Sequence, residues 1–221
     1  MRYPLLLAFV CASPLPAATI VLTDGTVSTI PDGSSSGLAR SLTVNAGGQT
    51  ITSVEVDVNV SASGSGFIGD LYLYLTNGTN LSVLANRPGR RAGSPAGYGD
   101  SQPVTITFSD SGAADFHSYR IPVTGSNATP LSGPLTGTWQ PDARLVDPAS
   151  VLDTDARSAM LSVFNGAVAD GTWSLFAADL SSGAVHQLNS WTLRIETIPE
   201  PSAATVGILT VCGVLLRRRR A

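Results

Sequence analysis

The chain has 221 residues, of which 43% are hydrophobic, 6% aromatic and 13% charged, and all its basic residues are arginines. This length suits one domain with a core large enough to fold without disulfides. When the two apolar ends described below are set aside, 8 Arg stand against 15 Asp and Glu, a net charge of about −7. That charge argues against a nucleic-acid partner, which needs a basic surface. Both cysteines also lie in the two ends, so we expect no disulfide in between.

Residues 1–18 have the composition of a secretory signal peptide. Arg2 supplies a positive start, residues 5–10 form an apolar run, and residues 14–18 form a small-residue end. This order predicts export with cleavage near Ala18. The export machinery is therefore an expected partner.

The N-terminal segment, residues 19–50, is predicted to contribute an edge strand over 20–22 and a second strand over 38–44. We expect a soft loop through residues 31–36 between them. The letters GSSSG at 33–37 match the G-x-S-x-G pattern of a serine nucleophile, but that pattern has meaning only between a strand and a helix. Here it lies in a Ser-rich loop before a strand, so we interpret it as coincidence.

Residues 51–108 show the clearest strand patterns. Apolar residues alternate with polar or aromatic ones over 51–60, 71–75 and 104–108, which predicts three strands with one face buried. The inward residues are predicted to be Val54, Val56, Val58, Val60, Leu71, Leu73, Leu75, Val104, Ile106 and Phe108. Asn77-Gly78 predicts a hairpin turn into a strand over 81–85, and residues 87–99 read as a loop.

Weaker patterns follow. We predict a strand over 116–123, a long connection over 124–148, and a helix over 151–164 from its approximate helical spacing. Residues 171–197 are clearer, because two alternating runs flank a Gly- and Ser-containing connection. Trp173 shares a face of the first run with Leu175 and Ala177, and Trp191 shares a face of the second with Leu193 and Ile195. Each run therefore offers one indole to a common core.

The short strands, abundant Gly and Ser, and lack of a long helix predict an all-β protein, an antiparallel jelly-roll-like β-sandwich. Within residues 51–197, two runs are similar to signatures of the P/Homo B module, the P domain of proprotein convertases. The first is Gly69-Asp70-Leu71-Tyr72-Leu73-Tyr74-Leu75 with Asn77-Gly78-Thr79, and the second is Gly171-Thr172-Trp173-Ser174-Leu175 with Asp179, Gly183 and Trp191-Thr192-Leu193.

This resemblance implies a jelly-roll β-sandwich of the kind that supports a neighbouring subtilisin-like protease. The sequence leaves no segment for such a protease, so we expect the resemblance to carry a fold and no active site. A role as an accessory domain for a separate protease stays open.

Residues 198–221 combine three features in order. Pro199, Glu200 and Pro201 follow the last strand, residues 203–216 are uncharged and mostly apolar, and a basic block closes the chain: Arg217, Arg218, Arg219 and Arg220. The apolar part would form a short transmembrane helix of about 21 Å, against roughly 30 Å of hydrocarbon. The arginines are expected to stay on the cytoplasmic side.

The three features resemble the PEP-CTERM sorting signal of Gram-negative bacteria, with an ordinary tail anchor as the alternative. In that family an exosortase cuts the tail, and members are often linked to exopolysaccharide or biofilm matrix. The resemblance therefore implies a transient tether in the inner membrane, followed by release to the cell surface or the extracellular space. It makes Pro199, Glu200 and Pro201 the processing signal and the arginine block the determinant of topology.

No catalytic residue is assigned from the sequence. His117 and His186 each lie in or beside a predicted loop, and we expect exposed or locally hydrogen-bonded side chains rather than a catalytic base. For a metal, Asp70 and Asp179 are candidate ligands of a structural Ca²⁺, because carboxylates suit this ion outside the cell. No other cofactor is indicated.

Two hypotheses of function remain. The first is a non-catalytic module of the cell surface or matrix. The second is a glycan-binding module in which Tyr98, Tyr119 and Trp139 stack on sugar rings, although the same three residues would also serve to fill the core.

Overall fold

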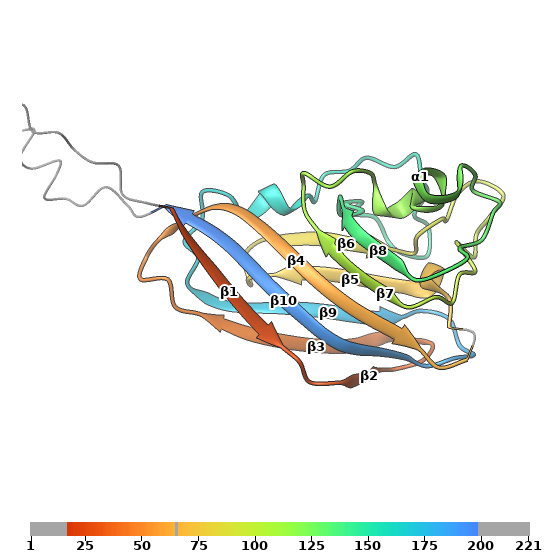
Figure 1. Cartoon of the computed structure of the whole chain (residues 1–221), viewed down its shortest axis with the longest axis horizontal. Coiled ribbons are helices and arrows are strands. Elements are labelled where there is room, and N and C mark those ends of the chain that lie inside the picture. The colour runs from red at the N-terminus through yellow and green to blue at the C-terminus, as the bar shows by residue number, and fades with distance from the viewer. Residues whose placement is uncertain (1–16, 65, 199–221) are drawn as a thin grey trace, which may run out of the picture.

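The computed structural model describes residues 17–64 and 66–198, which form two β-sheets packed face to face (Figure 1). The six-stranded sheet contains, in order, β1 (Ala18–Asp24), β10 (His186–Ile198), β4 (Thr50–Ala62), β7 (Val104–Phe108) and β8 (Leu135–Trp139), with β2 (Ser28–Ile30) also paired to β10. The four-stranded sheet contains β3 (Ser34–Val44), β9 (Gly171–Asp179), β5 (Leu71–Thr76) and β6 (Leu81–Asn86). The all-β sandwich is confirmed.

Most of the two predicted terminal signals falls outside the described residues. This holds for residues 1–16 of the signal peptide and for the sorting features Pro199, Glu200, Pro201, Arg217, Arg218, Arg219 and Arg220. Within 17–64 and 66–198, no helix has the length and apolar character needed to cross a membrane.

The two tryptophan-bearing strands meet across the core rather than side by side. Strand β9 lies in the four-stranded sheet and β10 in the six-stranded sheet, so their apolar faces oppose each other. Trp173 is 0% and Trp191 1% exposed. The predicted common core of the two runs is confirmed.

The other strongly alternating segments also form the predicted strands. The inward valines of β4 and the inward leucines of β5 are buried, and the Asn77-Gly78 turn joins β5 to its antiparallel partner β6. Because side chains alternate along a strand, the intervening polar residues of β4 lie on the outer face of the six-stranded sheet.

The N-terminal segment is an integral part of the sandwich. Strand β1 pairs with β10 along its whole length, from Ala18 opposite Thr197 to Asp24 opposite Trp191. Strand β3 begins at Ser34, so the loop predicted over residues 31–36 ends earlier than expected. No helix follows the GSSSG letters, which run into the irregular start of β3.

The connection predicted over 124–148 contains a strand that sequence patterning does not reveal. Strand β8 buries only its two end residues, Leu135 and Trp139, and its middle residues are exposed. It pairs with β7 in parallel, so the sandwich is not wholly antiparallel. A strand with apolar side chains only at its ends lacks the alternation on which the prediction depends.

The strand predicted over 116–123 is wrong. Residues Phe116–Ser118 form a 3₁₀ turn and Arg120–Thr124 form α1. The Asp115 carboxylate accepts a hydrogen bond from the His117 backbone N–H at 2.9 Å, which favours a turn. Pro122 has no N–H to donate to a sheet, but near the start of a helix none is needed.

The helix predicted over 151–164 is also wrong, and only Leu161–Phe164 forms a 3₁₀ turn. Side-chain carboxylates accept hydrogen bonds from three backbone N–H groups of this segment, and a helix would need two of them, those of Leu161 and Ser162. Asp155 accepts from Leu152 N at 2.8 Å, and Asp110 accepts from Leu161 N and Ser162 N at 2.9 and 2.7 Å. Such contacts compete with helix formation.

Candidate functional site

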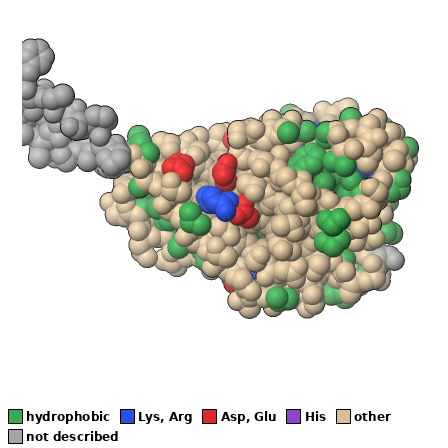
Figure 2. Space-filling view, in the orientation of Figure 1, with side chains coloured by type: hydrophobic (Ala, Val, Ile, Leu, Met, Phe, Trp, Pro, Cys, Tyr) green, Lys and Arg blue, Asp and Glu red, His purple; other side chains and the backbone are tan. Residues whose placement is uncertain are grey.

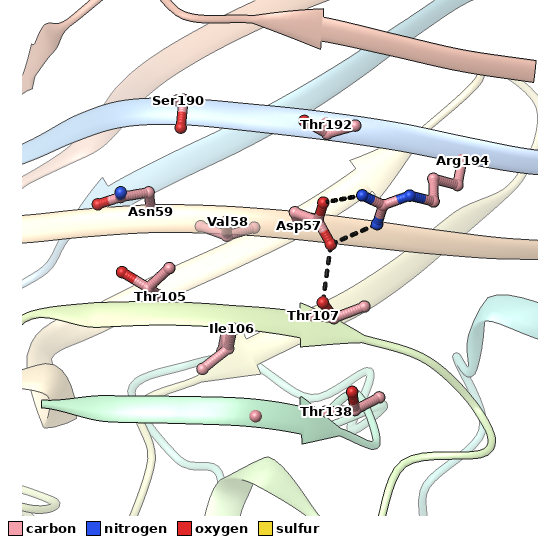
Figure 3. A pocket seen from close by; sticks show the side chains of 11 residues that line it. Asp57, Val58, Asn59, Thr105, Ile106, Thr107, Thr138, Ser190, Thr192 and Arg194 are labelled. Atoms are coloured by element: carbon pink, nitrogen blue, oxygen red, sulfur yellow. Dashed lines mark hydrogen bonds and ion pairs between the residues drawn. The ribbon is translucent and has the colours of Figure 1, made fainter.

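A polar groove crosses the outer face of the six-stranded sheet (Figure 3). It has a volume of about 450 Å³ and draws its residues from four strands, β4, β7, β8 and β10. The lining residues are Asp57, Val58, Asn59, Thr105, Ile106, Thr107, Gly137, Thr138, Ser190, Thr192 and Arg194. Val58 and Ile106 are core residues that only border it.

Strand register brings the polar side chains of the groove into rows. Thr192 lies opposite Asp57, Asp57 opposite Thr107, and Thr107 opposite Thr138. A second row follows from the pairing of Asn59 with Ser190 and with Thr105. Neighbouring strands are about 4.8 Å apart, so each row presents closely spaced polar groups on a rigid backbone.

An ion pair occupies one end of the groove. Arg194 donates from Nη1 to Oδ1 of Asp57 at 2.7 Å, its Nη2 lies 2.6 Å from Oδ2, and Thr107 Oγ1 also donates to Oδ1 at 2.7 Å (Figure 3). The hydrogen bond to Asp57 is the main reason that the pKa of Arg194 is raised. The guanidinium thus stays charged, the pair is fixed in orientation by these contacts, and about a third of each side chain remains exposed.

The groove is therefore suited to recognise a ligand rich in hydroxyl groups. Threonine and serine hydroxyls both donate and accept, the Asn59 amide does both through separate atoms, and the ion pair offers charged donors and acceptors. Because these groups stand on strands, they are positioned before a ligand arrives. The lining residues include no histidine or cysteine.

The predicted stacking residues Tyr98, Tyr119 and Trp139 do not line the groove. They are 2%, 0% and 6% exposed, so none offers a ring face to a sugar, and this prediction is wrong. Tyr98 and Tyr119 pack edge to face at 4.9 Å, and Phe116 links Tyr119 to Trp139. All three fill the core, which was the alternative for them.

A buried ion pair holds this aromatic cluster to the loops around it. Arg120 stacks over the Tyr98 ring at 4.6 Å and binds Asp100 through Nε at 2.7 Å and Nη2 at 2.9 Å. Tyr119 donates to the same carboxylate at 2.6 Å. Burial and this hydrogen bond raise the pKa of Tyr119, so the phenol stays protonated as a donor.

The two candidate calcium ligands are each occupied by a basic partner. Asp70 binds Arg87 at 3.1 Å, and Asp179 binds His186 at 2.6 Å. The backbones of the two residues are close, since Asp179 pairs with Leu71, the residue after Asp70, across β9 and β5. Over residues 17–64 and 66–198, no three His, Cys, Asp or Glu side chains converge as a metal site would require. A cation here would have to displace the basic partners.

Both histidines are buried and hydrogen-bonded. Of the two alternatives expected for them, the hydrogen-bonded one agrees with the structure and the exposed one is wrong. His186 is 2% exposed and connects the two sheets through Asp179. His117 is fully buried, with Nδ1 at 2.7 Å from Asp142 and Nε2 at 2.8 Å from the Arg90 carbonyl oxygen. Both of these partners only accept hydrogen bonds, so His117 satisfies both only as a doubly protonated imidazolium.

Comparison with known proteins does not assign the chain to a family. No family model matches the chain, and no curated protein matches it. The resemblances to the P domain and to PEP-CTERM signals therefore stay predictions.

Sequence reasoning missed the groove because it treated outward strand residues only as the solvated face. The signal was present in the outward residues Asp57 and Asn59 on β4 and Thr105 and Thr107 on β7. Their relation to Arg194, 137 residues from Asp57, depends on strand order, which the sequence pattern does not reveal.

Proposed function

We propose that this protein is an exported, non-catalytic β-sandwich module of the bacterial cell surface or extracellular matrix that binds glycan through its six-stranded sheet. The observation that carries the proposal is the groove, with its rows of hydroxyl groups and its fixed Asp57–Arg194 pair on four strands. A glycan offers many hydroxyl groups, and each can exchange donors and acceptors with such a surface.

The electrostatic character of the sheet supports this assignment. Figure 2 shows one prominent basic patch bordered by acidic atoms on a face that is otherwise mostly uncharged. Nucleic acid would need many basic groups along its path. A neutral, hydroxyl-rich polymer needs none, so a glycan fits this face better.

Replacing Thr107 by valine tests the groove. This substitution removes the hydroxyl group and keeps the β-branched shape, and we expect it to weaken binding by roughly 3–10-fold, since a hydrogen bond contributes about 1 kcal/mol. Affinity electrophoresis against exopolysaccharides from the producing bacterium measures the effect. Thr43→Val, on the exposed face of β3 in the other sheet, is the matched control and should bind normally. Failure of the wild-type protein to bind any of these polymers would remove the proposal.

The sorting route is the second part of the proposal. The resemblance of Pro199, Glu200 and Pro201 and the arginine block to a PEP-CTERM tail supports transient tethering followed by exosortase cleavage. The last described strand ends at Ile198, immediately before these residues.

Cell fractionation tests this route. We expect the wild-type protein in a shortened form outside the inner membrane, and a variant with Arg217, Arg218, Arg219 and Arg220 changed to Gln uncut or mislocalised, because the arginines set orientation. The control changes the same four arginines to Lys, which keeps their positive charge, and should be processed like the wild type. An uncut wild-type protein that stays in the inner membrane would contradict exosortase processing.

A further inference from the structure

A second hollow continues the groove along β4. It has a volume of about 220 Å³ and is lined by Ser53, Val54, Glu55, Ser109, Asp110, Ser111, Leu161, Ser162 and Asn165. Glu55 lies two residues before Asp57 of the groove, and Ser109 lies two residues after Thr107. Residues two apart on a strand share a face. Glu55 and Asp57 both belong to β4, so the two hollows follow one another along the outer face of that strand.

The combined site is long, and hydroxyl and amide groups line it at both ends. From Ser53 to Asn59 it follows six residue steps of β4, about 20 Å at the usual rise of a strand. Hydroxyl and amide groups occur at both ends, with Ser162 and Asn165 in the second hollow and Asn59 and Ser190 in the groove. A site of this length suits a chain molecule rather than a single sugar.

The charges of the combined site disfavour an anionic ligand. Three carboxylates line it, Glu55, Asp57 and Asp110, against one guanidinium, Arg194. Arg194 is already bound by Asp57 and lies opposite Glu55 in the strand register. Asp110 is fixed by two backbone N–H groups. A uronate or sulfate group would meet net negative charge with no free basic partner among the lining residues.

We infer that the ligand is a linear glycan without carboxylate or sulfate groups, lying along β4 across both hollows. The inference rests on the proposed function and specifies its substrate class. Hydroxyl groups of successive sugar units would bind the serine, threonine and asparagine side chains. The excess of carboxylates would repel polyuronates.

Matched pairs of oligosaccharides test the charge argument. Glucan, galactan and mannan hexamers are compared with the glucuronate, galacturonate and mannuronate hexamers by isothermal titration calorimetry on the purified exported protein. We expect at least one neutral hexamer to bind at least 10-fold more tightly than its uronate counterpart. The difference should shrink in high salt, because salt screens exposed charges. Glu55→Gln should raise the affinity for the uronate hexamer severalfold, and by more than it changes the affinity for the neutral hexamer.

A second experiment tests the length of the bound glycan and the role of the second hollow. The bound hexamer should bind at least 10-fold more tightly than the dimer of the same sugar, and Asn165→Ala should weaken the hexamer severalfold but leave the dimer unchanged or nearly so. Asn45→Ala, an exposed asparagine outside both hollows, is the control.

The outcomes separate the two proposals. Equal or tighter binding of uronates, or a hexamer no better than its dimer, overturns the inference while leaving a glycan-binding module. Absence of binding to every neutral and uronate chain overturns the inference and argues against the proposed function, which the exopolysaccharide assay with Thr107→Val then decides independently.

Discussion

Replacing Trp173 by alanine should lower the free energy of unfolding by about 3–5 kcal/mol, the usual range for deleting a large buried aromatic side chain. Trp173 is fully buried between the sheets, packs against Phe164 with ring centroids 4.8 Å apart, and donates from Nε1 to the Ala169 carbonyl oxygen at 3.0 Å. The truncation removes both contacts and leaves a cavity that the surrounding strands close only in part. Denaturation in urea measures the change.

The second core tryptophan offers a matched comparison. Trp191 is equally buried, but its Nε1 has no hydrogen-bond partner within the described chain. Trp173→Phe should therefore destabilise the protein by about 1 kcal/mol more than Trp191→Phe, because only the first change leaves a buried carbonyl without its donor. A larger loss for Trp191→Phe would show that the Trp173 hydrogen bond is not the deciding difference.

Replacing Asp142 by alanine should also cost about 3–5 kcal/mol below pH 6, because it leaves buried charges without their partner. The Asp142 carboxylate is fully buried and binds His117 Nδ1 at 2.7 Å, Arg144 Nη1 at 3.1 Å and the Asn86 backbone N–H at 3.1 Å. Removing it affects all three groups. Asp147→Ala, an exposed carboxylate in a nearby turn, is the control and should cost far less.

The pH dependence of stability gives a sharper readout of the same contact. Burial by itself lowers the pKa of His117, but the hydrogen bond and charge of Asp142, with the Arg90 carbonyl, outweigh burial and raise it above 6.5. A raised pKa in the folded state means that stabilisation by the charged histidine is complete below pH 6.5 and is lost as pH rises through the higher folded value.

We therefore expect the free energy of unfolding of the wild-type protein to fall as pH rises above 6.5. The difference between wild type and Asp142→Ala should be largest below that pH and should narrow above it. Urea denaturation from pH 5 to pH 9 measures both curves. Parallel curves would contradict an imidazolium at His117, and an NMR titration of the ring would give independent evidence.

The sequence predicted the fold most accurately in segments where apolar and polar residues alternate strongly. The valines of β4, the leucines of β5 and the indoles of β9 and β10 are buried as predicted, because the period of two along a strand is a local property. Strand β8 and helix α1 were missed. In β8 only Leu135 and Trp139 are buried, and in α1 the buried residue is Arg120, which binds Asp100. Contacts with distant parts of the chain therefore override a weak local preference in both segments.

The candidate site was less predictable than the fold. Tyr98, Tyr119 and Trp139 were candidates because aromatic rings suit sugars, yet they pack together beneath the loops. Whether a ring is exposed depends on which segments cover it, and no pattern around these residues indicates that. The groove was not anticipated, because it depends on four strands that the sequence does not order.

The amino-acid sequence by itself determined that the chain forms an all-β sandwich, and which side of each alternating strand enters the core, because neighbouring residues encode that choice. Only the tertiary structure decided which charges meet. Asp57 pairs with Arg194, 137 residues away in the sequence, and His117 pairs with Asp142, 25 residues away. These pairs depend on strand order, strand register and the path of the loops. All three are set when the whole chain packs, so no single segment of the sequence determines them.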